Sequence, residues 1–114
     1  MTQREKAKFR YSDEWKDFRS LCKKESGNVD YITREPLTQR GWELHHLDVT
    51  KDGYTQIGNK ADFICVNHST HLCLHYLYDI VSKLSDKEAD IALTGIFDRY
   101  RTVLKEMRAK CHTD

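Results

Sequence analysis

The sequence predicts an α+β domain in which a β-hairpin leads into a helix and is flanked by an N-terminal helix and a long C-terminal helix. Three segments carry apolar residues every three or four positions, as on the buried face of a helix. Two segments between the first and second of these have the composition of strands. The length of 114 residues, with 39% apolar and 32% charged residues, fits one domain with one core, which we place at residues 1–114.

The first helix is predicted over residues 12–24. Ser12 followed by two acidic residues has the composition of a helix start. Apolar side chains then fall on one face, namely Trp15, Phe18, Leu21 and Cys22. The turn-forming residues at 26–28 end the helix, and a short extended piece at residues 31–33 leads to the single proline, Pro36.

Two strands are predicted to form a hairpin with a long loop. The first covers residues 41–49, and the second is the short apolar run FICV at residues 63–66. Asp-Gly at 52–53 and Gly-Asn at 58–59 are turn signals within the connection. The histidine pair of the first strand, His45 and His46, therefore lies in the hairpin.

Two helices are predicted to follow the hairpin, at residues 68–84 and 86–110. Asn67 is a suitable N-cap for the first, and the Ser-Asp-Lys-Glu sequence at 85–88 is a capping box for the second. The last helix has an apolar stripe with a period of 3.6 residues and a separate basic face. The stripe consists of Leu93, Ile96, Phe97, Tyr100, Val103, Leu104 and Met107, and the basic face of Arg101, Lys105 and Arg108.

The histidines of the second helix have the spacing of a metal site. His71 and His75 are four residues apart, so they share one face and can bind one divalent ion. Zinc metalloproteases use the same spacing but need a glutamate where this chain has Leu72, which excludes that class. His45 is the natural third ligand. Three histidines without cysteine indicate an open catalytic site, with a purely structural metal site as the alternative.

His46 would then be free to act as a general base. Adjacent residues of a strand point to opposite faces of the sheet. His45 and His46 can therefore serve one site only if the strand kinks or ends immediately after His45. The sequence thus predicts a break in the strand at this point.

Three motifs in this order resemble the HNH, or ββα-metal (His-Me finger), endonucleases. They are YSDEWKDFRSL before the hairpin, ELHHLD in the first strand, and DFICVNHSTHLCLH in the second strand and helix. The resemblance covers most of the chain and implies a ββα-metal core at about residues 30–84. It implies a phosphodiester hydrolase acting on DNA, with His46 as general base and one divalent ion, Mg, Mn, Zn or Ni, held by His45, His71 and His75.

The chain departs from that family at two places. The middle asparagine of the motif falls on Asp62, with Asn59 as the alternative if the loop register slides. Either would orient the His46 ring by accepting a hydrogen bond. The paired CxxC motifs of many relatives are missing, and Asp30 and Thr33 stand near the first pair. We expect the long C-terminal helix to supply the core that those zinc sites would have stabilised.

Several cations are candidates for nucleic-acid contacts. Arg40 or Arg34 would hold the scissile phosphate, and His68 either touches phosphate or lies in the first helical turn. The basic face of the last helix would follow a nucleic-acid backbone. A plain solvated position is as consistent with Arg40 and Arg34, and it is the favoured interpretation for His68 and for the basic face of the last helix.

Composition limits the remaining alternatives. A net charge of +1 disfavours binding by charge alone, so DNA, or RNA as a second candidate, would be reached through a local face or a targeting protein. The sequence has no membrane-spanning apolar run, and its polar N-terminus predicts a cytoplasmic protein. The four scattered cysteines are expected to be reduced.

The alternative function is a non-catalytic nucleic-acid or protein-binding module with a structural metal, and the oligomeric state is left open.

Overall fold

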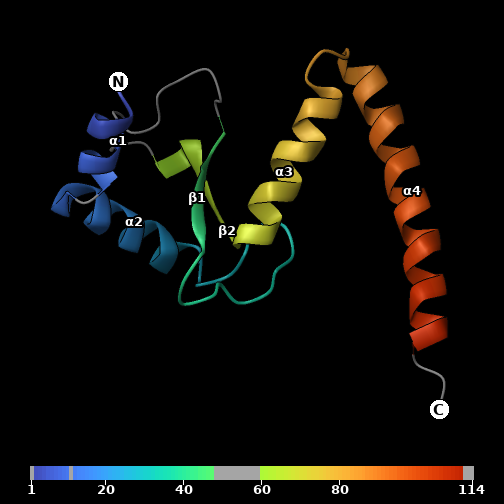
Figure 1. Ribbon diagram of the computed structural model, residues 1–114, viewed down its shortest axis with the longest axis horizontal. Coiled ribbons are helices and arrows are strands. Elements are labelled where there is room, and N and C mark those ends of the chain that lie inside the picture. Colours follow the sequence, from blue (N-terminus) through green and yellow to red (C-terminus); the bar gives the residue numbers. More distant parts are fainter. Residues whose placement is uncertain (1, 11, 48–59, 112–114) are drawn as a thin grey trace. The chain divides into compact units, whose positions relative to one another are not determined.

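The computed structural model describes residues 2–10, 12–47 and 60–111 (Figure 1). It confirms the mixed α+β class, with helices and a two-stranded antiparallel sheet. The chain divides into two compact units, residues 1–73 and 74–114, and the division falls within one helix. The elements are α1 (Gln3–Arg10), α2 (Asp13–Glu25), β1 (Glu43–His46), the 3-10 helix η2 (Lys60–Asp62), β2 (Phe63–Val66), α3 (His68–Val81) and α4 (Asp86–Cys111).

Capping hydrogen bonds explain where the N-terminal helices begin. The Ser12 hydroxyl accepts a hydrogen bond from the Trp15 N–H, so α2 starts where the sequence predicts. Helix α1 was not predicted. The Thr2 hydroxyl accepts a hydrogen bond from the Glu5 N–H and donates one to its carboxylate, both at 3.1 Å. The Thr-x-x-Glu spacing was a capping signal in the sequence.

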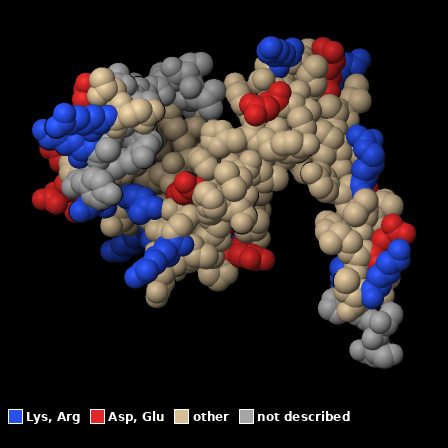
Figure 2. Space-filling view, in the orientation of Figure 1, with Lys and Arg blue, Asp and Glu red and all other residues tan. Residues whose placement is uncertain are grey.

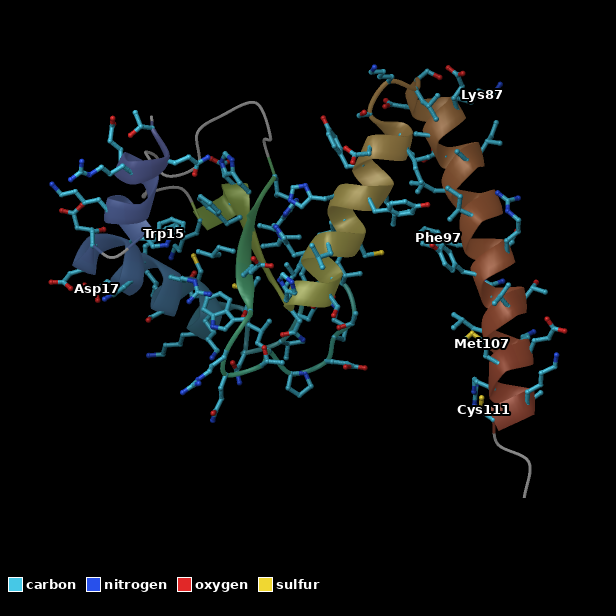
Figure 3. All side chains as sticks on the ribbon, in the orientation of Figure 1. Trp15, Asp17, Lys87, Phe97, Met107 and Cys111 are labelled. Atoms are coloured by element: carbon cyan, nitrogen blue, oxygen red, sulfur yellow. The ribbon has the colours of Figure 1, made fainter. Side chains whose placement is uncertain are left out.

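The core of the first unit lies between α2 and the hairpin. The rings of Trp15, Phe18 and Phe63 pack together, with centroids 5.4 to 6.2 Å apart. Figure 3 shows Trp15 projecting from α2 towards the hairpin and Asp17 projecting away from it. The predicted face of α2 is confirmed except for Leu21, which is 43% exposed. The complete core cluster is Trp15, Phe18, Cys22, Leu37, Trp42, Phe63 and Cys65.

The hairpin pairs Glu43 with Val66 and His46 with Phe63. Strand β1 begins two residues later than predicted, because Trp42 contacts helix α2 and is not part of the strand. The Arg19 guanidinium lies 3.9 Å from the centre of the buried Trp42 ring and donates a hydrogen bond to its carbonyl. Residues 48 and 49 of the predicted strand, and both turn signals of the loop, lie outside the described residues.

A buried carboxylate connects the segment before β1 to the start of α3. Asp30 is 0% exposed, and its oxygens accept hydrogen bonds from the N–H groups of Ile32, Thr33 and Asn67 at 2.8 to 2.9 Å. Burial by itself would raise the pKa of Asp30, but these bonds and one from Thr70 outweigh it and lower the pKa. Residues 31–33 therefore form a turn around the carboxylate and not the extended piece that we expected.

The second unit contains the rest of α3 and all of α4. Helix α3 ends at Val81, three residues earlier than predicted, and the capping box between Ser85 and Glu88 starts α4 as predicted. No residue of α4 is buried. The expectation that this helix supplies the missing core stays a prediction, since the described core of the first unit comes from α2, the hairpin and the segment between them.

All four cysteines are free thiols, two of them buried (Cys22 and Cys65) and two exposed (Cys73 and Cys111). Among the described helices, none combines the length and the apolar character that a membrane span requires.

Candidate metal centre

His45 and His71 meet on one face of the hairpin. His45 pairs with Ile64 in the antiparallel register, so both side chains leave the sheet on the face opposite Phe63. Helix α3 starts two residues after β2 ends and places His71 over the same face. The two Nδ1 atoms lie 3.2 Å apart, and the rings meet at 73° with centroids separated by 5.2 Å.

His75 completes a group of three. It lies one turn beyond His71 on the continuous helix α3, so helical geometry alone brings the two imidazoles to one face. One ligand atom from each of His45, His71 and His75 lies within 4.8 Å of the other two. His45 and His71 are half-buried and His75 is exposed. The predicted ligand set is therefore close enough to hold a metal ion.

The spacing fits a single ion. Two nitrogens bound tetrahedrally at about 2.0 to 2.1 Å from one ion are roughly 3.3 Å apart, and the Nδ1 atoms of His45 and His71 are 3.2 Å apart. Within the described part of the chain, the group consists of three histidines. A donor set of this kind leaves coordination positions for water and a substrate oxygen.

Glu43 is a polar neighbour of this group that the sequence analysis missed. Its Oε2 accepts a hydrogen bond from His68 Nδ1 at 3.1 Å and lies 4.0 Å from His71 Nδ1. Glu43 precedes His45 by two residues, and the two-residue period of a strand places both on one face. This two-residue period was the feature of the sequence that could have identified Glu43. A half-buried carboxylate beside the imidazoles favours a bound cation.

His46 lies on the opposite face of the hairpin. Its ring packs against Phe63, with centroids 4.8 Å apart, and both ring nitrogens are buried without a hydrogen-bond partner in the described part of the chain. The predicted break after His45 is wrong. The Leu47 N–H donates to the Asp62 carbonyl at 2.8 Å, so regular pairing continues past His46 and keeps the alternation of faces.

The expected hydrogen bond from His46 to Asp62 is absent from the described residues. Asp62 is the last residue of η2, and its backbone carbonyl bonds to Leu47. Asn59, the other candidate for the middle motif position, lies outside the described residues.

Two arginines near the hairpin differ in their surroundings. Arg40 is exposed, and its backbone carbonyl accepts a hydrogen bond from the Thr38 hydroxyl at 2.6 Å. Arg34 has a φ of 65°, a left-handed conformation that is uncommon for a residue other than glycine, and its guanidinium lies 5.1 Å from the centre of the Tyr31 ring. Of the two guanidinium groups, that of Arg34 therefore lies over an aromatic ring, whereas the described contact of Arg40 involves its backbone.

The basic residues of α4 lie along an exposed surface. Arg101 is paired with Asp98 at 3.6 Å, and Lys105 and Arg108 are exposed. Figure 2 shows Lys and Arg side chains along α4 with Asp and Glu side chains between them. Such interspersed charge resembles an ordinary solvated helix face more closely than a continuous basic track.

Comparison with protein-family models, with curated proteins and with solved structures gives no match. An assignment of function therefore depends on the histidine geometry and on the motif residues of the chain.

Proposed function

We propose that the chain is an HNH-type endonuclease that hydrolyses phosphodiester bonds in DNA with one divalent ion. The observation that supports this is the convergence of three imidazoles from β1 and α3, with ligand atoms within 4.8 Å of one another. Strand, strand and helix follow in the order of the ELHHLD and DFICVNHSTHLCLH motifs.

The donor set narrows the choice of ion. Imidazole nitrogens suit zinc and nickel, whereas magnesium and manganese prefer oxygen ligands. Three histidines therefore favour Zn²⁺ or Ni²⁺ over Mg²⁺ or Mn²⁺. When bound, such an ion would polarise a non-bridging phosphate oxygen and offset the charge that develops on the departing 3′ oxygen.

His46 is the proposed general base, which removes a proton from the attacking water. Within the described residues its nitrogens are not committed to a structural hydrogen bond, although a buried unpartnered polar group costs about 1 to 3 kcal/mol. The ring lies on the Phe63 face, so this role requires the His46 side chain, or the end of β1, to turn towards His45.

The position of His46 also favours a second candidate function. A module that binds DNA, RNA or a protein around a structural metal needs the three ligands but no base beside them. In that case the His46 ring would stay against Phe63, as the structure places it.

Arg40 is the proposed phosphate-holding cation. Arg40 is exposed and precedes β1 by three residues, whereas the guanidinium of Arg34 lies over a tyrosine ring. A charged hydrogen bond from Arg40 to a non-bridging oxygen would position the phosphodiester. Arg34 would contact the backbone farther along.

Plasmid cleavage with a panel of Mg²⁺, Mn²⁺, Zn²⁺ and Ni²⁺, combined with calorimetric metal titration, distinguishes these functions. For a nuclease, His46→Ala abolishes cleavage but not metal binding, His71→Ala abolishes both, and the control Asp13→Ala, at an exposed residue of α2, retains both. Metal binding without cleavage by the unmodified chain supports the non-catalytic module. A chain that binds none of the four ions would exclude both functions.

A further inference from the structure

The apolar stripe of α4 is exposed mainly in the second half of the helix. Leu93 and Ile96 are half-buried, whereas five later residues are each about half exposed. These five, which we call the α4 patch, are Phe97 (49%), Tyr100 (49%), Val103 (52%), Leu104 (51%) and Met107 (54%). Figure 3 shows Phe97, Met107 and Cys111 projecting from the same side of α4.

The spacing of the stripe is that of a helix that packs lengthwise against another helix. Ile96, Tyr100, Val103 and Met107 follow one another at intervals of four, three and four residues, which is the a/d spacing of a coiled coil. Phe97 and Leu104, seven residues apart, widen the stripe along one edge. Soluble chains rarely leave a continuous apolar stripe of this kind in water.

We propose that a second copy of this chain covers the α4 patch, with the two α4 helices antiparallel about a twofold axis near residues 101 and 102. In this register Tyr100 faces Val103 of the other copy, and Ile96 faces Met107. Phe97 packs against Leu104 along one edge. Every residue of the patch thus meets an apolar partner, as a twofold interface of one surface with itself requires.

Charge favours this antiparallel register over a parallel one. Arg99 and Glu106 flank the stripe on its other edge, seven residues apart. The antiparallel register brings Arg99 of each copy beside Glu106 of the other, which forms two ion pairs. A parallel register would place Arg99 beside Leu104 and form neither pair. The basic residues Arg101, Lys105 and Arg108 remain on the outer side in the proposed dimer.

The size of the patch predicts a reversible dimer. At 49% exposure, Phe97 and Tyr100 each expose roughly 75 to 125 Å², given about 150 to 250 Å² for a whole aromatic side chain. The five residues of the α4 patch together expose roughly 400 to 500 Å² per copy. A dimer would therefore bury about 800 to 1,000 Å² in total, which is below the range of stable interfaces. We therefore expect a Kd in the micromolar range.

Sedimentation velocity of the full chain from about 1 to 300 µM, a range that spans micromolar dissociation constants, tests this proposal. The mass should rise from monomer to dimer, and Val103→Glu should keep the chain monomeric. Arg99→Glu and Glu106→Arg should each weaken the dimer about 10-fold, and the double variant should restore it. Ile91→Glu is the matched control, because Ile91 is 66% exposed but lies off the stripe.

Helix content measured by circular dichroism verifies that each variant folds. A chain that stays monomeric over the whole range overturns the proposal, as does a dimer that Val103→Glu leaves intact. A dimer that the double charge exchange fails to restore overturns the antiparallel register. None of these outcomes depends on the metal centre or on nuclease activity.

Discussion

Two adjacent histidines of β1 lie in different chemical surroundings. His45 faces an imidazole and a carboxylate, with His71 Nδ1 3.2 Å away and Glu43 on the same side of the strand. His46 faces the aromatic core, packs on Phe63, and makes no hydrogen bond to another described residue. One step along a regular strand therefore separates a polar face that can bind metal from an apolar face. Metal binding and proton transfer should accordingly respond to different substitutions.

The largest expected effect is the loss of metal affinity in His71→Ala. Removing a direct ligand should weaken zinc binding by more than about 100-fold, since even indirect partners of a metal contribute 10-fold to 100-fold. His46→Ala should leave the affinity within about 3-fold of the parent, because its ring is on the other face. Isothermal titration with Zn²⁺ measures both. Equal losses in the two variants would show that the faces are not separate.

Removing the Asp30 carboxylate should destabilise the fold, because this side chain connects the segment before β1 to the start of α3. Asp30→Ala leaves the part-buried N–H groups of Ile32, Thr33 and Asn67 without their acceptor, so we expect a loss of about 2 to 4 kcal/mol in the free energy of unfolding. Urea denaturation gives this value. Asp13→Ala is the control, since this carboxylate is exposed at the start of α2. Similar stability of the two variants would contradict the role of Asp30.

The same carboxylate predicts the response to acid. The hydrogen bonds lower the folded-state pKa of Asp30 below its unfolded value, so its contribution is complete above about pH 4 and is lost as the pH falls through the folded pKa. The parent chain should therefore lose more stability than Asp30→Ala between about pH 4 and pH 2. Urea melts across this interval check the sign, and parallel curves would contradict it.

Much of the arrangement of the three histidines could be predicted from the sequence, because the periods of the helix and the strand determine it. The four-residue spacing sets His71 and His75 on one helix face, and the strand pattern supplies His45. The predicted direction of the His46 side chain was wrong. The break in the strand was inferred from what a catalytic site would require, whereas the hydrogen-bonded pairing of the backbone determines to which face of the sheet each side chain points. The two-residue period that would have identified Glu43 was present but was not applied to it.

The helices show a second limit of sequence patterns. The period of α4 identified an apolar face correctly, but a period does not say what covers that face, and none of its residues is buried. The positions of Asp30 and Thr33 were noted in the sequence without a structural role. Here Asp30 is the acceptor of a hydrogen-bonded turn, which depends on contacts between residues 30 and 67 that are distant in sequence.

Replacing His46 with phenylalanine should sharpen the contrast between the faces. Phenylalanine removes two buried polar atoms that lack partners and keeps a ring against Phe63, so the free energy of unfolding should rise by about 1 kcal/mol. Plasmid cleavage should disappear. His45→Phe should instead abolish zinc binding. A destabilised His46→Phe chain would indicate that the ring nitrogens make a bond important for folding.

Thiol labelling should distinguish buried from exposed positions without changing stability. Burial raises the pKa of Cys22 to about 11, with smaller contributions from Cys65 and Glu25, and burial also raises the pKa of Cys65. At pH 8 a maleimide reagent should modify only the exposed Cys73 and Cys111. Mass spectrometry counts the labels. Four labels on the native chain would contradict a buried Cys22 and Cys65.

Anomalous diffraction from zinc-loaded crystals tests the metal centre most directly. We expect one zinc peak bound by ring nitrogens of His45, His71 and His75 at about 2.0 to 2.2 Å. The same map shows whether His46 stays on Phe63 or turns towards the ion, which separates the non-catalytic module from the nuclease. A peak held by other residues, or no peak at saturating zinc, would contradict the proposed metal centre.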